Sequence, residues 1–138
     1  QNIVSEGSIP YITLRNPLPL SDLRKIALSK PIVSMGPKAR VQLTRVRSLA
    51  LKRYILGRAD GMCEGCKTDA PFRTANGPYL ECHHIHRLSD GGPDSPGNVI
   101  ALCPNCHREA HYSRDKNEFN KILESTVQEV ETRLKTDA

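Results

Sequence analysis

The chain has 138 residues and a formal net charge of +5, with no tryptophan, two phenylalanines and four tyrosines. No apolar run approaches the roughly 20 residues of a membrane-spanning helix, so the composition excludes such a helix and predicts no membrane partner. A chain this short forms one small domain with extensions, and residues 61–112 are too few to fold by apolar burial alone. We therefore expect a metal ion or disulfide bonds to stabilise that segment.

Residues 1–37 contain five of the ten prolines and one short helical segment, near Ser21 to Ser29. This composition predicts an N-terminal arm or linker with a short helix. The first residues have neither the basic head nor the apolar stretch of a signal peptide, so we expect a cytoplasmic, reducing setting. Because the chain does not begin with Met, we also expect it to be a fragment of a longer protein.

A basic segment follows, with seven Lys and Arg residues and no acidic residue between positions 38 and 58. Residues 44–59 are mostly Leu, Ala, Lys and Arg, which predicts a basic helix. Such a segment suits the phosphate backbone of nucleic acid, and the alternative is an ordinary solvated helix face. The candidate nucleic-acid contacts on this helix are Arg45, Arg47, Lys52, Arg53 and Arg58.

Four of the five cysteines form two Cys-x-x-Cys pairs, Cys63/Cys66 and Cys103/Cys106. Two such pairs can close a tetrahedral Cys₄ site with no open position, which is typical of structural zinc. The alternative is that these four residues are merely buried in a core. Cys82 is the fifth, and its place within a predicted strand indicates a small buried residue rather than a ligand.

The segment between and after these pairs predicts a ββα arrangement. Strands are expected over 79–85 and 98–102, with a turn-rich loop between them and a helical turn after Cys106. The sequence therefore predicts an α+β fold, in which a small ββα core is stabilised by a zinc ion bound to four cysteines and is flanked by helices. We expect one domain over 38–138, with its core at 61–112.

A C-terminal helix is expected over about 115–135, because apolar residues recur there at helical spacing with charged residues between them. Such a helix buries one face against the core or a partner. The expected buried stripe consists of Phe119, Ile122, Leu123, Val127, Val130 and Leu134.

All five histidines lie between positions 83 and 111. His107 and His111 stand at i and i+4, so their side chains project from one face of the predicted helix. With His83 they form a candidate set of three nitrogen ligands that leaves positions open for water and a phosphate oxygen. The alternative is that these imidazoles only neighbour the zinc site and are satisfied by backbone hydrogen bonds.

Three sequence patterns together resemble the HNH endonuclease family, of the ββα-metal type with a Cys₄ zinc site. They are Glu81-Cys-His-His-Ile85, Leu88-Ser-Asp-Gly-Gly92, and the stretch from Asn98 through Cys-Pro-Asn-Cys-His to His111. The resemblance covers roughly residues 50–112. Within the family, the chain is most similar to the C-terminal nuclease domain of McrA-type restriction enzymes, which cut modified DNA.

The resemblance implies a role for each polar residue of these patterns. His83, His107 and His111 would bind a catalytic divalent ion, His84 would be the general base, and Asn98 would tie down the loop and help to orient that base. Relatives often have Asp at position 83, so this all-nitrogen set suits Zn²⁺, Ni²⁺, Co²⁺ or Mn²⁺ better than Mg²⁺. The resemblance to the family nevertheless implies Mg²⁺ or Mn²⁺ as candidates for the catalytic ion.

Two details of the pattern call for a local explanation. Adjacent residues of a regular strand point to opposite faces, yet His83 and His84 must serve one centre. We therefore expect the strand to be irregular, for instance bulged, or to end there. Relatives often have Pro shortly after the isoleucine, whereas this chain has His86-Arg87, and Arg87 either contacts a phosphate or is simply exposed.

The sequence thus predicts a metal-dependent DNA endonuclease domain of a restriction-type enzyme, leaving 5′-phosphate and 3′-hydroxyl ends. It would contain structural Zn²⁺ and one catalytic ion, Mg²⁺, Mn²⁺, Ni²⁺ or Zn²⁺. The alternative is a non-catalytic, zinc-stabilised module that binds nucleic acid. An RNA or single-strand nuclease is less favoured because few aromatic residues are present to stack on bases. A homodimer is compatible with the sequence.

Overall fold

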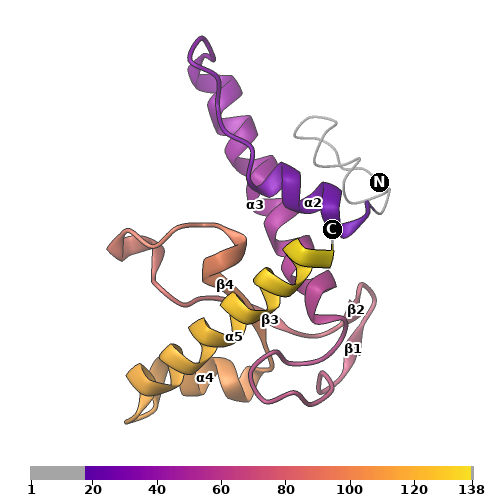
Figure 1. Cartoon of the computed structure of the whole chain (residues 1–138), viewed down its shortest axis with the longest axis vertical. Coiled ribbons are helices and arrows are strands. Elements are labelled where there is room, and N and C mark those ends of the chain that lie inside the picture. The colour runs from indigo at the N-terminus through magenta and orange to yellow at the C-terminus, as the bar shows by residue number, and fades with distance from the viewer. Residues whose placement is uncertain (1–17, 138) are drawn as a thin grey trace. The chain divides into compact units, whose positions relative to one another are not determined.

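The structure, a computed structural model, describes residues 18–137, which form helices and two small antiparallel sheets (Figure 1). The chain divides into two compact units between Tyr54 and Ile55. Most of the proline-rich segment, through residue 17, lies outside the described residues. No helix within the described range is long and apolar enough to cross a membrane.

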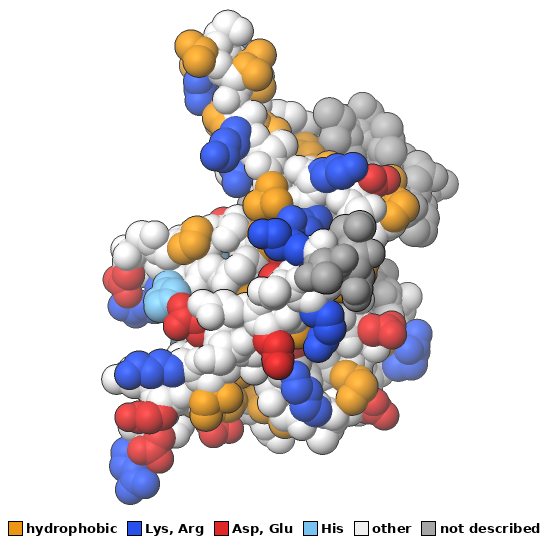
Figure 2. Space-filling model, viewed as in Figure 1, with side chains coloured by type: hydrophobic (Ala, Val, Ile, Leu, Met, Phe, Trp, Pro, Cys, Tyr) orange, Lys and Arg blue, Asp and Glu red, His pale blue; other side chains and the backbone are white. Residues whose placement is uncertain are grey.

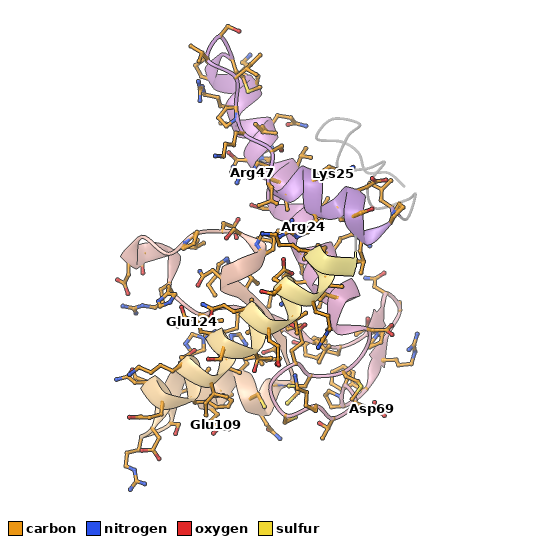
Figure 3. All side chains as sticks on the ribbon, in the orientation of Figure 1. Arg24, Lys25, Arg47, Asp69, Glu109 and Glu124 are labelled. Carbon is orange, nitrogen blue, oxygen red and sulfur yellow. The ribbon has the colours of Figure 1, made fainter. Side chains whose placement is uncertain are left out.

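The first unit contains α2 (Leu20–Ala27) and the first part of α3 (Pro37–Ala59). Helix α3 begins at Pro37 rather than near residue 44, because a proline in the first helical turn loses no hydrogen bond that the helix needs. Arg47, labelled in Figure 3, donates from Nε to the carbonyl of Ala27 at 3.3 Å. This contact ties the end of α2 to α3.

The second unit begins in the last turns of α3 and contains the two small sheets and two further helices. In chain order its elements are β1 (Arg73–Thr74), β2 (Gly77–Pro78), β3 (Glu81–His84), β4 (Val99–Leu102), α4 (Pro104–Tyr112) and α5 (Lys116–Asp137). The β1–β2 hairpin is an element that the sequence analysis did not anticipate. The remaining order is the expected ββα core followed by a C-terminal helix.

Strands β3 and β4 pair in regular antiparallel register, with Glu81 opposite Leu102 and His84 opposite Val99. Strand β3 ends at His84, so the strand end, rather than a bulge within the pairing, marks this site. All four residues of β4 are buried, and α4 and α5 pack against this strand. Burial on both faces explains why β4 reads as a continuous apolar run.

Helix α5 buries Leu123 and Val127, as expected, and its buried side continues to Glu131. The expected stripe was wrong at Ile122, whose side chain is 61% exposed, because successive helical residues turn by about 100° and Leu123 takes the inward position. The exposed charges of α5 are of both signs (Figure 2). This helix therefore offers no uniformly basic face.

Candidate metal centres and active site

The four paired cysteines converge on one point. The sulfur atoms of Cys63, Cys66, Cys103 and Cys106 lie within 4.8 Å of one another. Zinc bound to four thiolates at about 2.3 Å sets its sulfur atoms about 3.8 Å apart, and Sγ of Cys66 is 4.0 Å from Sγ of Cys103. The donor set therefore fits structural Zn²⁺, and Cys82 lies outside it.

Backbone N–H groups surround these sulfur atoms. Sγ of Cys63 accepts from Gly65 at 3.3 Å and from Cys66 at 3.4 Å. Sγ of Cys103 accepts from the N–H of Cys106 at 3.5 Å, which makes Cys103 the N-cap of α4. One of the four cysteines thus caps the start of α4.

The thiols of this site differ in acidity. A hydrogen bond with the Thr68 hydroxyl lowers the pKa of Cys66 to about 6, whereas burial raises the pKa of the Cys103 and Cys106 thiols. Zinc binds cysteine as the thiolate. A bound cation would therefore have to offset the cost of ionising the two buried thiols.

Three imidazoles form a second group. His83 of β3 and His107 and His111 of α4 offer nitrogen atoms within 4.8 Å of one another, and the Nε2 atoms of His107 and His111 are 3.2 Å apart. His83 is only 4% exposed. Burial lowers the pKa of both His83 and His111, which favours the neutral imidazole that a metal ion requires. Three nitrogen ligands with open positions fit a divalent transition ion.

Two of these imidazoles are held through their second ring nitrogen. Nδ1 of His107 lies 2.7 Å from Oε1 of Glu81, and the Tyr79 hydroxyl donates to Oε2 of Glu81 at 2.6 Å. The hydrogen bond from Tyr79, followed by that with His107, lowers the pKa of Glu81. Nε2 of His83 lies 2.8 Å from Oδ1 of Asn120 on α5. Contacts of this kind orient metal-binding histidines in proteins.

His84 stands beside this group at the end of β3. Its Nε2 lies 2.7 Å from Oδ1 of Asp94 in the loop between the strands. The side chain of His84 is 28% exposed, so its ring is accessible to solvent and to a substrate.

Asn98 is buried and holds the same loop closed. Its Nδ2 donates to the carbonyls of His86 at 2.9 Å and Pro93 at 2.8 Å, and its Oδ1 accepts from the N–H of His86 at 2.9 Å. Pro93 directly precedes Asp94, the partner of His84. These contacts give Asn98 the geometry of a support for the loop that carries Asp94.

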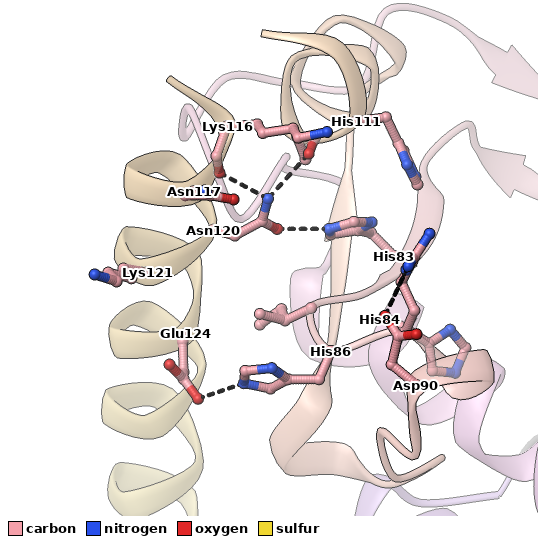
Figure 4. A pocket seen from close by; sticks show the side chains of 13 residues that line it. His83, His84, His86, Asp90, His111, Lys116, Asn117, Asn120, Lys121 and Glu124 are labelled. Carbon is pink, nitrogen blue, oxygen red and sulfur yellow. Dashed lines mark hydrogen bonds and ion pairs between the residues drawn. The ribbon is translucent and has the colours of Figure 1, made fainter. Parts of the chain in front are cut away.

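Four of the five histidines, His83, His84, His86 and His111, line one pocket of about 650 Å³ (Figure 4). Arg87 also lines this pocket, with a side chain that is 68% exposed and paired with Asp90 at 2.8 Å. Helix α5 forms another wall, with Lys116, Asn117, Asn120, Lys121 and Glu124.

Arg58 is not a surface cation, contrary to expectation. Its side chain is 1% exposed and pairs with Glu64 at 2.8 Å and with Glu131 of α5 at 2.9 Å. It also donates to the carbonyls of Pro96 and Val99. A guanidinium enclosed by two carboxylates and two carbonyls has no free donors for DNA, so its role is structural.

The other candidate cations of α3 belong to the first unit. Arg45, Lys52 and Arg53 are exposed, and Arg47 is partly buried through its bond to Ala27. The exposed three have the accessibility that a phosphate contact needs. DNA binding by all four stays a prediction.

Three functional candidates escaped the sequence analysis: Glu81, Asp94 and Asn120. A signal for Glu81 was present, because residues two apart in a strand share a face, and Glu81 therefore lies on the same side as His83. Asp94 stands in a turn-rich loop where acidic residues are common. Asn120 contacts a histidine 37 positions away, and no local pattern predicts such a pairing.

Comparison with known proteins adds a family to this geometry. Residues 63–113 match the model of the HNH endonuclease family. This segment is an HNH endonuclease domain. The chain is 46% identical over 107 residues to the type IV methyl-directed restriction enzyme EcoKMcrA of Escherichia coli strain K12, an alignment that covers 75% of this chain and 39% of that protein.

A solved structure also resembles the chain. The type IV phosphorothioation-dependent restriction endonuclease ScoMcrA matches with a TM-score of 0.63 and 27% identity, over 88% of this chain and 26% of that one. The chain therefore spans less than half the length of either relative. These matches confirm the resemblance to McrA-type nucleases and the ββα HNH fold that the sequence predicted.

Proposed function

We propose that this chain is the DNA-cleaving domain of a restriction-type enzyme and that it hydrolyses phosphodiester bonds with the help of a divalent ion. The observation that carries the proposal is the convergence of His83, His107 and His111 in an HNH domain, where two of these imidazoles, His83 and His111, line the same pocket as His84. An ion bound by the three imidazoles would supply Lewis-acid stabilisation of charge on the phosphate. The four zinc cysteines would hold the scaffold, as suits a reducing cytoplasm.

His84 is proposed as the general base. A carboxylate only accepts hydrogen bonds, so the contact with Asp94 places the ring hydrogen of His84 on Nε2 and leaves a lone pair on Nδ1. Nδ1 can then take a proton from the attacking water. Loss of the 3′ oxygen from phosphorus would leave 5′-phosphate and 3′-hydroxyl ends, as the family resemblance implies.

We also propose that five cationic side chains contact DNA phosphates: Arg45, Arg47, Lys52, Arg53 and Arg87. Such contacts position DNA without reading its sequence. They predict a binding affinity that falls as salt concentration rises, because each neutralised phosphate releases counterions.

Plasmid cleavage by the zinc-loaded chain tests the base. With Mn²⁺, Ni²⁺ or Mg²⁺ added, His84→Ala is expected to lower the cleavage rate by roughly 10²–10⁴-fold. His86→Ala is the matched control, because His86 lies outside the three-imidazole group and pairs with Glu124. Undiminished cutting by His84→Ala would remove His84 as the base.

The same experiment separates a nuclease from a module that only binds. A binder has no physical need for three converging imidazoles next to a fourth that is held by a carboxylate. Wild-type chain that retains zinc and binds DNA, yet cuts with none of the three ions, would favour the binder.

We further propose that recognition of modified DNA does not reside in this domain. The two relatives are named for different modifications, methyl and phosphorothioate groups, although both resemble this chain. A segment shared by enzymes of different specificity supplies their common chemistry. This chain is therefore expected to cut unmodified, methylated and phosphorothioated plasmids at rates that agree with one another within about 2-fold. A strong preference for one substrate would place recognition within this chain.

A further inference from the structure

Helix α5 lies outside the matched HNH segment, residues 63–113, yet it forms one wall of the catalytic pocket. The residue of α5 that reaches a proposed metal ligand is Asn120. In Figure 4 its side chain points from the helix toward the ring of His83. No catalytic role for α5 follows from the family pattern, so this contact needs its own explanation.

The amide of Asn120 is fixed in one orientation. Its Nδ2 donates to two carbonyls, that of Ala110 in α4 at 2.9 Å and that of Lys116 in α5 at 2.8 Å. A flipped amide would place its oxygen against both carbonyl oxygens, which cannot donate. Oδ1 is therefore the atom that faces His83.

This orientation decides where His83 carries its hydrogen. An amide oxygen only accepts, so Nε2 of His83 must donate across the 2.8 Å contact. In a neutral imidazole the other nitrogen, Nδ1, then holds the lone pair. His83 thus has one nitrogen committed to α5 and one available to the metal group that it forms with His107 and His111.

We infer that Asn120 is a positioning residue for the catalytic ion: it fixes the Nε2–H tautomer and the ring orientation of His83, so that Nδ1 is presented as the ligand. The inference rests on the proposed function for its catalytic meaning. Asn120 also donates to the carbonyl of Ala110, the residue directly before His111. From outside the HNH core it therefore helps to position two of the three ligands, His83 and His111.

The test measures tautomer and metal binding as well as cleavage. Long-range ¹H–¹⁵N NMR of the zinc-loaded, otherwise metal-free chain should show His83 as the Nε2–H tautomer in the wild type and a mixture in Asn120→Ala. Titration with Mn²⁺ or Ni²⁺ should show affinity weakened by roughly 10–100-fold in Asn120→Ala. Gln128→Ala removes an exposed amide from the same helix, away from the pocket, and should keep wild-type values.

Asn120→Asp separates positioning from general support of the fold, because it keeps an oxygen for His83 while losing both donations to carbonyls. It is expected to retain the wild-type tautomer and to recover metal affinity relative to Asn120→Ala. Equal loss of affinity in the Ala and Asp variants, with the His83 tautomer unchanged in both, would overturn the inference. If the wild-type chain binds the ion and shows the expected tautomer but cuts no DNA, that result would contradict the proposed function and leave the role of Asn120 intact.

Discussion

At the scale of single residues, the candidate active site is built from imidazoles whose second nitrogen is already engaged by an oxygen atom. The three accepting oxygen atoms come from different parts of the second unit, a strand, a loop and a helix: Glu81, Asp94 and Asn120. Each contact removes rotational freedom from a ring before a metal ion or substrate arrives. Preorganisation of this kind lowers the cost of assembling the site.

Glu81 provides a prediction at this scale. Glu81→Ala removes the carboxylate that holds Nδ1 of His107, so the affinity of the histidine site for Mn²⁺ or Ni²⁺ should fall by roughly 10–100-fold. Isothermal titration of the zinc-loaded chain measures this. Tyr79→Phe, which keeps the carboxylate and removes only its second partner, should have a much smaller effect. Unchanged affinity in Glu81→Ala would show that His107 is oriented by the helix alone.

At the scale of elements, Arg58 connects segments that are far apart in sequence. From the last turn of α3 it binds Glu64, which lies between Cys63 and Cys66, and Glu131 of α5. Glu64 in turn accepts from the N–H of Ala101 in β4 at 3.0 Å. One buried ion network therefore joins the end of α3, the segment between Cys63 and Cys66, strand β4 and helix α5.

Removing the arginine from this network should be costly, because two carboxylates would remain buried without their partner. Arg58→Met is expected to lower the free energy of unfolding by about 3–5 kcal/mol, whereas Arg53→Met, at an exposed position of the same helix, should change it by less than about 0.5 kcal/mol. Urea unfolding followed by circular dichroism measures both. Weaker DNA binding by Arg58→Met at unchanged stability would restore Arg58 as a DNA contact.

The elements also show which features could be predicted from local sequence patterns and which could not. The i, i+4 spacing of His107 and His111 and the two Cys-x-x-Cys pairs are local geometry, and the structure brings each set together as the spacing predicted. The start of α3 at Pro37 and the exposure of Ile122 were missed. A proline is compatible with a linker as well as with a first helical turn, and an apolar residue at the edge of a stripe faces whichever side the neighbouring elements leave open.

At the scale of the whole molecule, the four cysteines join the segment after α3 to the start of α4, and α4 carries two of the three imidazoles. A zinc ion held by these cysteines would stabilise a domain of this small size beyond what its apolar burial provides. Folding of the second unit and assembly of the catalytic site should therefore both depend on zinc.

Cys106→Ser tests this dependence. Loss of one thiolate should abolish stoichiometric zinc binding and cooperative unfolding of the second unit, because structural zinc contributes about 10–16 kcal/mol in small zinc domains. Zinc content by elemental analysis and thermal unfolding by circular dichroism measure the outcome. Cys82→Ser makes the same chemical change outside the cysteine group and should retain one zinc per chain. A cooperative, zinc-free Cys106→Ser protein would contradict the structural role.

The sequence by itself determined the candidate metal ligands of this protein, because metal ligands recur at spacings set by the local backbone: two cysteine pairs, and two histidines one helical turn apart. It also indicated the ββα order and the HNH resemblance that the comparisons confirmed. Only the tertiary structure decided which side chains support those ligands and which cations are buried. Asn120 contacts His83 across 37 positions of the sequence, and Arg58 contacts Glu131 across 73. Partner choice and burial depend on packing between distant segments, which no local spacing encodes.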